Sequence, residues 1–171
     1  MQADLSIRRA SELDAQRIAE IYNWYVLNTT VTFETEPVAS NEMSERIKSK
    51  LEGHDWIVGE WNHEIIGYAY YGSFRPRAAY QHTVESTVYL DQRSTRRGFG
   101  KRIYSALIQS ANERGFRQLI GVIALPNAAS LALHKALGFR EMGTLQGVGH
   151  KFGRDVDVAL CQRAANQKSS D

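Results

Sequence analysis

The chain has 171 residues and an ordinary apolar content, which predicts one domain with a sizeable core. Its formal net charge of +2 is too small to indicate a nucleic-acid partner, so any basic function must be local. A single cysteine, Cys161, excludes an internal disulfide and fits a reducing compartment. The N-terminus lacks an apolar signal core and no apolar run is long enough to span a bilayer, so we expect a cytoplasmic protein without a membrane partner.

The first third of the chain predicts one strand and two helices. Residues 5–10 alternate as a strand does, and Ser11 has the character of a helix N-cap. A second helix is expected to start at Ser40 or Asn41 and to end near Gly53. The apolar side chains of the first helix recur at helical spacing and are Leu13, Ile18, Ile21, Tyr22, Tyr25 and Val26.

The rest of the chain predicts a sheet that closes with a β-α-β unit. The runs "WIVGEW" and "EIIGYAYYGSF" flank an Asn-His turn, and His82–Leu90 alternates strictly between two faces. A helix should follow residue 98 and end at Gly115, and "LIGVIAL" has the pattern of a strand buried on both faces. Asn127 and Gly138 should bound a short helix, and "FREMGTL" and "RDVDVALCQR" read as two further strands.

The element order is therefore β-α-α-β-β-β-α-β-α-β-β. This order predicts an α/β fold with a mixed, mostly antiparallel sheet, a central β-α-β unit and helices on both faces. No repeat or linker is visible, so residues 1–163 are expected to form a single domain. Residues 164–171 have the composition of a polar, disordered C-terminal tail.

The stretch "TRRGFGKRIY", residues 95–104, predicts a phosphate-binding turn ahead of a helix. Glycines allow the backbone to approach an anion, and the free N–H groups of a first helical turn attract it. A Walker A loop needs another spacing and a hydroxyl after the lysine, and a dinucleotide fingerprint needs a third glycine where Ile103 stands. A basic helix start with a glycine turn and no ligand remains the alternative.

Three sequence blocks flank this loop in a distinctive order. The strand "ESTVYL", the loop, the strand "VIAL" and the helix "PNAASLALHKALGF" together resemble the acetyl-CoA core of the GCN5-related N-acetyltransferases, or GNAT superfamily. The blocks "TVESTVYL", "TFETEP", "IALPNAASLALHKALGF" and "GHKFGR" are similar to its phosphinothricin and methionine sulfoximine/sulfone N-acetyltransferases. The resemblance extends over about residues 5–163 and implies acetyl-CoA as co-substrate and a homodimer.

The resemblance implies which residues hold acetyl-CoA. The family loop pattern [Q/R]-x-x-G-x-[G/A] falls on Thr95, Gly98 and Gly100, so Thr95 departs from the usual Gln or Arg. Arg96 and Arg97 are candidates to replace the missing charge. The amides of three strand residues match the oxyanion donors of the family, with plain strand pairing as the alternative. The implied cofactor-binding residues are Val88, Tyr89, Leu90, Arg96, Arg97, Gly98, Phe99, Gly100, Lys101, Asn127, Ser130 and His134.

Two residues are candidates for proton transfer. An α-amine is mostly protonated at pH 7, so a base must take its proton before attack. Glu85 lies mid-strand among apolar neighbours, where its pKa should be raised, and the subgroup has its catalytic glutamate in "VESTVY". An ion pair with Arg75 or Arg77 is the alternative for Glu85. His134 stands where relatives carry a proton donor for the leaving thiolate, and a packed histidine is the alternative.

Substrate-binding residues are implied by the loops around the predicted strand of Glu85. A carboxylate-bearing acceptor suits a bidentate arginine, for which Arg75 and Arg77 are candidates. Phe33 and Glu34 match the segment that covers the acceptor site in the subgroup, and Trp61 and Tyr80 are candidates for its walls. Asp155 replaces an aromatic residue that relatives often carry, which indicates a different acceptor pocket.

Other functions remain open from the sequence. The same fold can acetylate a protein or peptide amine, or it can serve as a non-catalytic coenzyme-A-binding module. A covalent acetyl-cysteine route is disfavoured because Cys161 lies far along the chain from any candidate base. The five histidines lack metal-ligand spacing, and the aromatic residues follow no basic stripe, so neither a metal nor a nucleic acid is expected.

Overall fold

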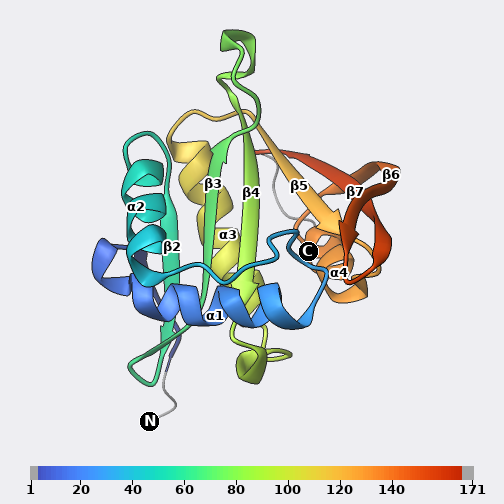
Figure 1. The fold of residues 1–171 in the computed structure, drawn as a ribbon. Helices are drawn as coiled ribbons and strands as arrows, with labels where there is room; N and C mark the ends of the chain where they lie inside the picture. The colour runs from blue at the N-terminus through green and yellow to red at the C-terminus, as the bar shows by residue number, and fades with distance from the viewer. Residues whose placement is uncertain (1–3, 167–171) are drawn as a thin grey trace.

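The computed structural model describes residues 4–166, which form one seven-stranded sheet with helices on both faces (Figure 1). The order of strands and α-helices is the predicted one, and three short 3-10 turns are added to it. The elements are β1 Ser6–Arg9, α1 Ala15–Asn28, α2 Ser40–Leu51, β2 Trp56–Trp61, β3 Glu64–Ser73, β4 Thr83–Leu90, α3 Phe99–Glu113, β5 Gln118–Ala124, α4 Ala128–Ala136, β6 Arg140–Lys151 and β7 Arg154–Ala164.

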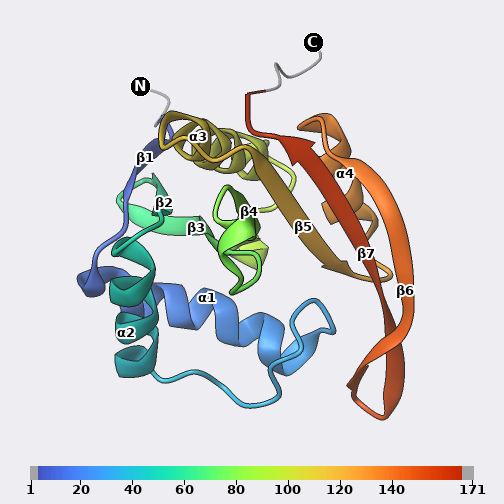
Figure 2. The same cartoon turned by 90° about the horizontal axis from the view of Figure 1, so that it is seen from above.

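The sheet confirms the predicted fold class. Its strand order is β1-β2-β3-β4-β5-β7-β6, and every neighbouring pair is antiparallel except β4 and β5. The parallel pair β4–β5 is joined by α3, as a parallel connection through a helix requires. Figure 2 shows α1 and α2 on one side of the sheet and α3 on the other.

Two cores cover the two faces of the sheet. On one face, α1 and α2 bury side chains that include Ile18, Val26 and Ile47. On the other face, α3 contributes Ile103 and Leu107, and residues at the end of α4 join the same core. No helix among residues 4–166 is both long and apolar enough to cross a bilayer.

The strands β4 and β5 separate halfway along their length. They pair only through Thr83–Ser86 and Gln118–Gly121, although β4 continues to Leu90 and β5 to Ala124. Figure 1 shows β5 turning away from β4 toward the β6–β7 hairpin. The prediction that this strand is buried on both faces is wrong at Val122, which is 44% exposed just beyond the point where β5 stops pairing with β4. The separation leaves an opening in the middle of the sheet.

Local signals placed most turns correctly. Asn62 and His63 both have positive φ, at 52° and 65°, as a tight two-residue hairpin turn requires. Gly115 and Gly138 have φ values of 83° and 82° and end α3 and α4, as predicted. Leu13 is a correction: it belongs to a 3-10 turn rather than to the apolar stripe and is 95% exposed. The prediction of Ser40 or Asn41 as N-cap is also wrong, because α2 is preceded by Ala39 as its N-cap.

The predicted C-terminal tail begins too early. Ala164 pairs with Gln118 in the β5–β7 ladder, and the N–H of Ala165 donates to the carbonyl of Arg117 at 2.9 Å. Ala165 follows β7 directly and is buried in the core on the α3 face of the sheet. The remainder of the predicted tail, 167–171, lies outside the described residues.

Candidate active site

Strand β4 presents two different faces, as its alternation predicted. Ser86 points toward α3, where its Oγ lies 2.8 Å from the Tyr104 hydroxyl. Tyr89 points to the opposite face and packs against Tyr22 of α1, with ring centroids 5.3 Å apart. Glu85 and Thr87 share this second face by the period of two. The predicted base therefore lies on the side of the sheet covered by α1 and α2.

Glu85 is half-buried and pairs with Gly72 of β3. Burial raises the pKa of its carboxyl, and the positive charge of Lys50 partly opposes this rise. The structure does not pair Glu85 with Arg75, whose guanidinium lies 4.9 Å and 5.7 Å from the ring centroids of Phe74 and Tyr80. Within residues 4–166, Glu85 takes part in no ion pair, so its carboxylate is available as a base.

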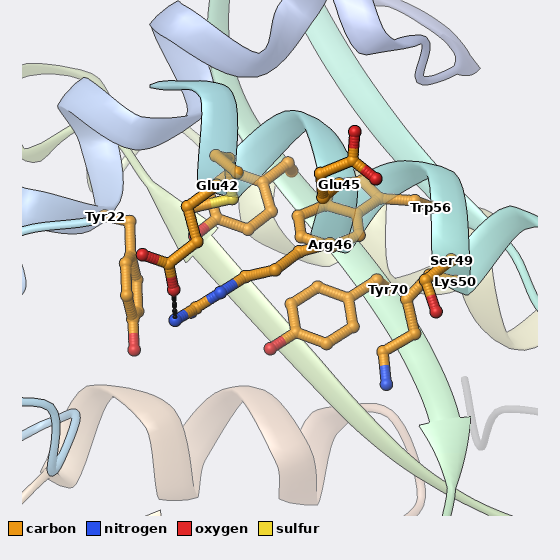
Figure 3. A pocket seen from close by; sticks show the side chains of 10 residues that line it. Tyr22, Glu42, Glu45, Arg46, Ser49, Lys50, Trp56 and Tyr70 are labelled. Atoms are coloured by element: carbon orange, nitrogen blue, oxygen red, sulfur yellow. Dashed lines mark hydrogen bonds and ion pairs between the residues drawn. The ribbon is translucent and has the colours of Figure 1, made fainter. Parts of the chain in front are cut away.

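A pocket of about 490 Å³ lies beside Glu85, between α2 and strands β2 and β3 (Figure 3). Its volume is in the range of small-molecule sites. Tyr70 is part of its wall and pairs with Thr87 of β4, two residues from Glu85. Tyr22, Arg46, Lys50 and Trp56 line it from the surrounding elements. The pocket thus combines aromatic walls with two cations and with the carboxylates of Glu42 and Glu45.

Glu34 helps to build this pocket by holding Arg46. The two guanidinium nitrogens of Arg46 donate to the Glu34 carboxylate at 2.6 Å and 3.1 Å, and the Tyr22 hydroxyl donates to it at 2.9 Å. Burial opposes ionisation of Glu34, but the hydrogen bonds from Arg46 and Tyr22 outweigh it and hold its pKa below the ordinary value. Arg46 also contacts Glu42 at 2.5 Å. Glu34 therefore acts on the pocket through its partners.

The segment around Phe33 meets the end of the β6–β7 hairpin. The Phe33 ring packs directly over Gly149, and a side chain at that glycine would overlap it. The buried Lys151 donates from Nζ to the carbonyl of Thr32 at 2.9 Å. Asp155 is turned to the surface, where it accepts from His150 at 2.8 Å. Two segments distant in sequence are thus joined near the pocket.

The other candidates for the acceptor site lie elsewhere. Arg75 and Arg77 are exposed on the β3–β4 connection, which projects from the sheet in Figure 1, and neither lines the pocket beside Glu85. Tyr80 packs against Phe74 in this same connection. Trp61 lies at the end of β2, under the guanidinium of Arg97. Within a single chain, these four side chains therefore do not line the pocket beside Glu85.

A second cavity opens on the far side of β4, where β4 and β5 separate. It is small, about 50 Å³, and its lining combines the second half of β4 with the start of α4. Asn127 caps α4, with its Oδ1 accepting from the N–H of Ser130 at 3.1 Å. The structure brings five predicted cofactor residues to this cavity, namely Val88, Tyr89, Asn127, Ser130 and His134.

His134 is buried between this cavity and the core. Its Nδ1 lies 2.8 Å from the carbonyl oxygen of Ser130, so this nitrogen carries the proton and donates it. Its Nε2 then accepts a hydrogen bond from the Tyr104 hydroxyl at 3.2 Å. The Tyr104 hydroxyl in turn accepts a hydrogen bond from Ser86. Burial lowers the pKa of His134 and keeps the ring neutral near pH 7.

This buried histidine predicts a pH dependence of stability. Because the folded-state pKa of His134 is depressed, its neutral form contributes stability above the unfolded pKa of about 6.5, and this is lost as the pH falls toward the folded pKa. As the pH falls below about 6.5, the free energy of unfolding of wild type should therefore decrease by more than that of His134→Gln. Urea titrations at several pH values measure the difference. His82→Gln, at an exposed histidine, should keep the wild-type slope; equal slopes for all three proteins would contradict the prediction.

The glycine loop forms the N-terminus of α3. Gly98 is the N-cap with φ of 76°, a left-handed conformation that suits glycine, and space is open around it. No side chain of residues 4–166 caps this helix, so its first N–H groups face outward. Gly100 packs close to Leu90, which lies 3.2 Å from the position of a Cβ there. Arg96 and Lys101 are exposed on either side of Gly98.

The comparisons with known proteins agree with this arrangement. Residues 7–160 match the family model of the acetyltransferase (GNAT) domain. The chain belongs to the GNAT acetyltransferases. It is 38% identical to a phosphinothricin N-acetyltransferase of Streptomyces viridochromogenes, over 93% of this chain and 87% of that protein. It is 36% identical to an L-methionine sulfoximine/L-methionine sulfone acetyltransferase of Pseudomonas paraeruginosa, over 92% of each chain.

Solved structures show the same fold. A phosphinothricin acetyltransferase of Sinorhizobium meliloti, crystallised with acetyl-CoA, superposes with a TM-score of 0.90 at 36% identity, over all of this chain and 95% of that one. Acetyl-CoA is thus the co-substrate of this acetyltransferase. The uncapped start of α3 fits a pyrophosphate, and the gap between β4 and β5 fits an arm reaching toward β4. Of the residues predicted to bind acetyl-CoA, Gly98, Phe99 and Gly100 lie at the start of α3, and five others line the cavity between β4 and β5.

Other reactive groups are accounted for by packing. Cys161 is buried in β7 opposite Gly121, and burial raises the pKa of its thiol, which agrees with the interpretation as a structural cysteine. Within the described part of the chain, no three His, Cys, Asp or Glu side chains gather as a metal site would require.

Three contributors to the two cavities were missed in the sequence. Arg46 and Lys50 belong to the polar helix "SNEMSERIKSKL" and look like ordinary solvated cations there. Tyr104 lies within the helix after the glycine loop, where an aromatic residue reads as core. No sequence motif marks these three residues, because each contacts residues outside its own helix.

Proposed function

We propose that this acetyltransferase moves the acetyl group of acetyl-CoA directly to the α-amine of a small amino-acid analogue of the phosphinothricin, methionine sulfoximine or methionine sulfone type. The observation that carries the proposal is Glu85, a half-buried carboxylate without an ion pair in the described chain, placed beside a pocket of about 490 Å³. Across β4 from this pocket lies the opening that fits the co-substrate. The activities of the named relatives support this acceptor class.

In the proposed mechanism, Glu85 takes the proton of the bound α-ammonium group. The raised pKa of Glu85 makes it a stronger base than an exposed carboxylate. Acetyl-CoA, when bound, supplies the activated thioester carbonyl. The half of β4 that lacks β5 as a neighbour holds Val88, Tyr89 and Leu90, whose amides we propose as donors to the developing oxyanion.

We also propose His134 as the proton donor to the departing thiol. It lines the cavity between β4 and β5, which supports this role. Its Nδ1–H is committed to the carbonyl of Ser130, so donation from Nε2 requires a proton on that nitrogen first. The Tyr104 hydroxyl contacts Nε2, but burial raises the pKa of Tyr104 and lowers that of His134, so Tyr104 orients the ring and keeps its own proton. The proton for the thiol then comes from the acceptor nitrogen, which loses one as the amide forms.

A thiol-release assay with acetyl-CoA tests the proposed function. Phosphinothricin, L-methionine sulfoximine and L-methionine sulfone are compared with a short peptide that has a free N-terminus. We expect thiol release with at least one of the three amino-acid analogues and little with the peptide. Release with the peptide alone would show a protein acceptor, and release with none of them, despite acetyl-CoA binding, would favour a non-catalytic module.

We further propose a cytoplasmic homodimer. The edge strand β6 exposes the side chains of Met142, Leu145 and Val148, and Phe152 is exposed at the turn after it, which supports contact with a second copy. Light scattering after size exclusion should give twice the chain mass of 19.3 kDa. Val148→Asp should reduce it toward one chain mass. A wild-type protein that elutes as a monomer at all concentrations would contradict this proposal.

A further inference from the structure

Lys50 reaches into the pocket beside Glu85 from the last turn of α2 (Figure 3). Its ammonium nitrogen lies directly over Gly72, where an added Cβ would overlap it. Gly72 is the β3 residue that pairs with Glu85 of β4. The absence of a side chain at Gly72 therefore lets a cation lie above the strand pair that carries the proposed base.

The two cations of the pocket differ in their partners. Arg46 is held by the carboxylates of Glu34 and Glu42, in contacts of 2.5 Å to 3.1 Å. The ammonium of Lys50 instead lies 5.8 Å from the centroid of the Tyr70 ring. Among residues 4–166, no carboxylate forms an ion pair with Lys50. Lys50 is thus the pocket cation whose charge is left for a ligand.

Lys50 and Glu85 interact without touching. The charge of Lys50 lowers the pKa of Glu85 against the larger effect of burial, so the two groups are near each other. They form no direct ion pair in this structure, and Lys50 is part of the pocket lining. A positive and a negative group that lie near each other without pairing are complementary to a zwitterion, whose carboxylate and ammonium are attached to one carbon.

We infer that Lys50 binds the α-carboxylate of the acceptor and thereby places its α-amine at Glu85. This inference rests on the proposed function and assigns to Lys50 the role that the sequence suggested for Arg75 and Arg77. It also gives a physical reason for selecting free amino acids. A peptide N-terminus has an amide in place of the α-carboxylate and offers Lys50 no charge.

The test compares Lys50→Met with wild type on two acceptors, L-methionine sulfone and its α-carboxamide, in saturating acetyl-CoA. A charge-assisted hydrogen bond is worth about 1.5–3 kcal/mol, so KM for the acid should rise about 10- to 100-fold. KM for the carboxamide should change little, because it has no charge for Lys50 to bind. Lys50→Arg should keep much of the preference for the acid.

A matched control variant and the choice of pH distinguish carboxylate binding by Lys50 from a general effect of lost charge. Lys48→Met removes the same charge from the same helical turn, but Lys48 is exposed and outside the pocket lining, so KM should stay at the wild-type value. Loss of Lys50 should also raise the pKa of Glu85, so the increase of kcat/KM with pH should move to higher pH for both acceptors. KM is therefore compared at a pH above this increase.

The outcomes are distinguishable from failure of the proposed function. If wild type acetylates methionine sulfone and Lys50→Met does so with an unchanged KM, only the inference about Lys50 is overturned. An equal rise in KM for acid and carboxamide, with acetyl-CoA binding and thermal stability retained, also overturns it, since the carboxylate is then not the group recognised. If wild type turns over neither acceptor, the proposed function itself fails.

Discussion

Glu85→Gln is expected to lower kcat/KM by about 10²- to 10⁴-fold, the usual contribution of a general base. Glutamine keeps the size and polarity of the side chain but cannot accept the proton of the α-ammonium group. Acetyl-CoA affinity should stay at the wild-type value, because Glu85 is not part of the lining of the cavity between β4 and β5. Steady-state kinetics and calorimetric titration with acetyl-CoA measure the two quantities.

The pH profile gives this prediction a second readout. In wild type, kcat/KM should rise with pH through the elevated pKa of Glu85, because the ionised carboxylate is the active form. The residual kcat/KM of Glu85→Gln should not show this rise with pH. Glu52→Gln, at an exposed glutamate after α2, serves as the charge-matched control and should behave as wild type. Wild-type turnover in Glu85→Gln would remove Glu85 from the role of base.

Gly98→Asp is expected to weaken acetyl-CoA binding by about 10- to 100-fold through helix-end electrostatics and backbone strain. An aspartate at this N-cap would satisfy the first N–H groups of α3 with its own carboxylate. The same carboxylate would repel the pyrophosphate that these groups attract in wild type. Because aspartate is a good N-cap, α3 should still form, so the loss would appear in binding and not in folding. Calorimetry with acetyl-CoA measures it.

Two further variants identify the cause of that loss. Gly53→Asp adds the same charge at another glycine with open space around it, after the end of α2, and should leave binding unchanged. Gly98→Ala imposes a positive φ on a neutral side chain and should cost less than the aspartate. If Gly98→Asp bound acetyl-CoA as tightly as wild type, the N-terminus of α3 would not be the anchor for the pyrophosphate.

The fold was predictable where the signals are local. The N-cap at Asn127 and the helix-ending glycines Gly115 and Gly138 depend on residues within one turn of the chain, and the structure places all three as predicted. The alternation of β4 put Ser86 and Tyr89 on opposite faces for the same reason. The order of the elements and the preference for short, right-handed connections then left only a few possible strand orders for the sheet.

The sequence by itself determined the order of elements and the family, because both are carried by contiguous motifs. The same motifs predicted residues of β4, the glycine loop and α4 as the acetyl-CoA site. Only the tertiary structure decided where β5 separates from β4, which exposed Val122. It also directed Arg75 onto its own hairpin and brought Lys50 of α2 over Gly72 beside Glu85. Charges act through space, so which cation faces the base depends on how the helix packs on the sheet and not on their distance along the chain.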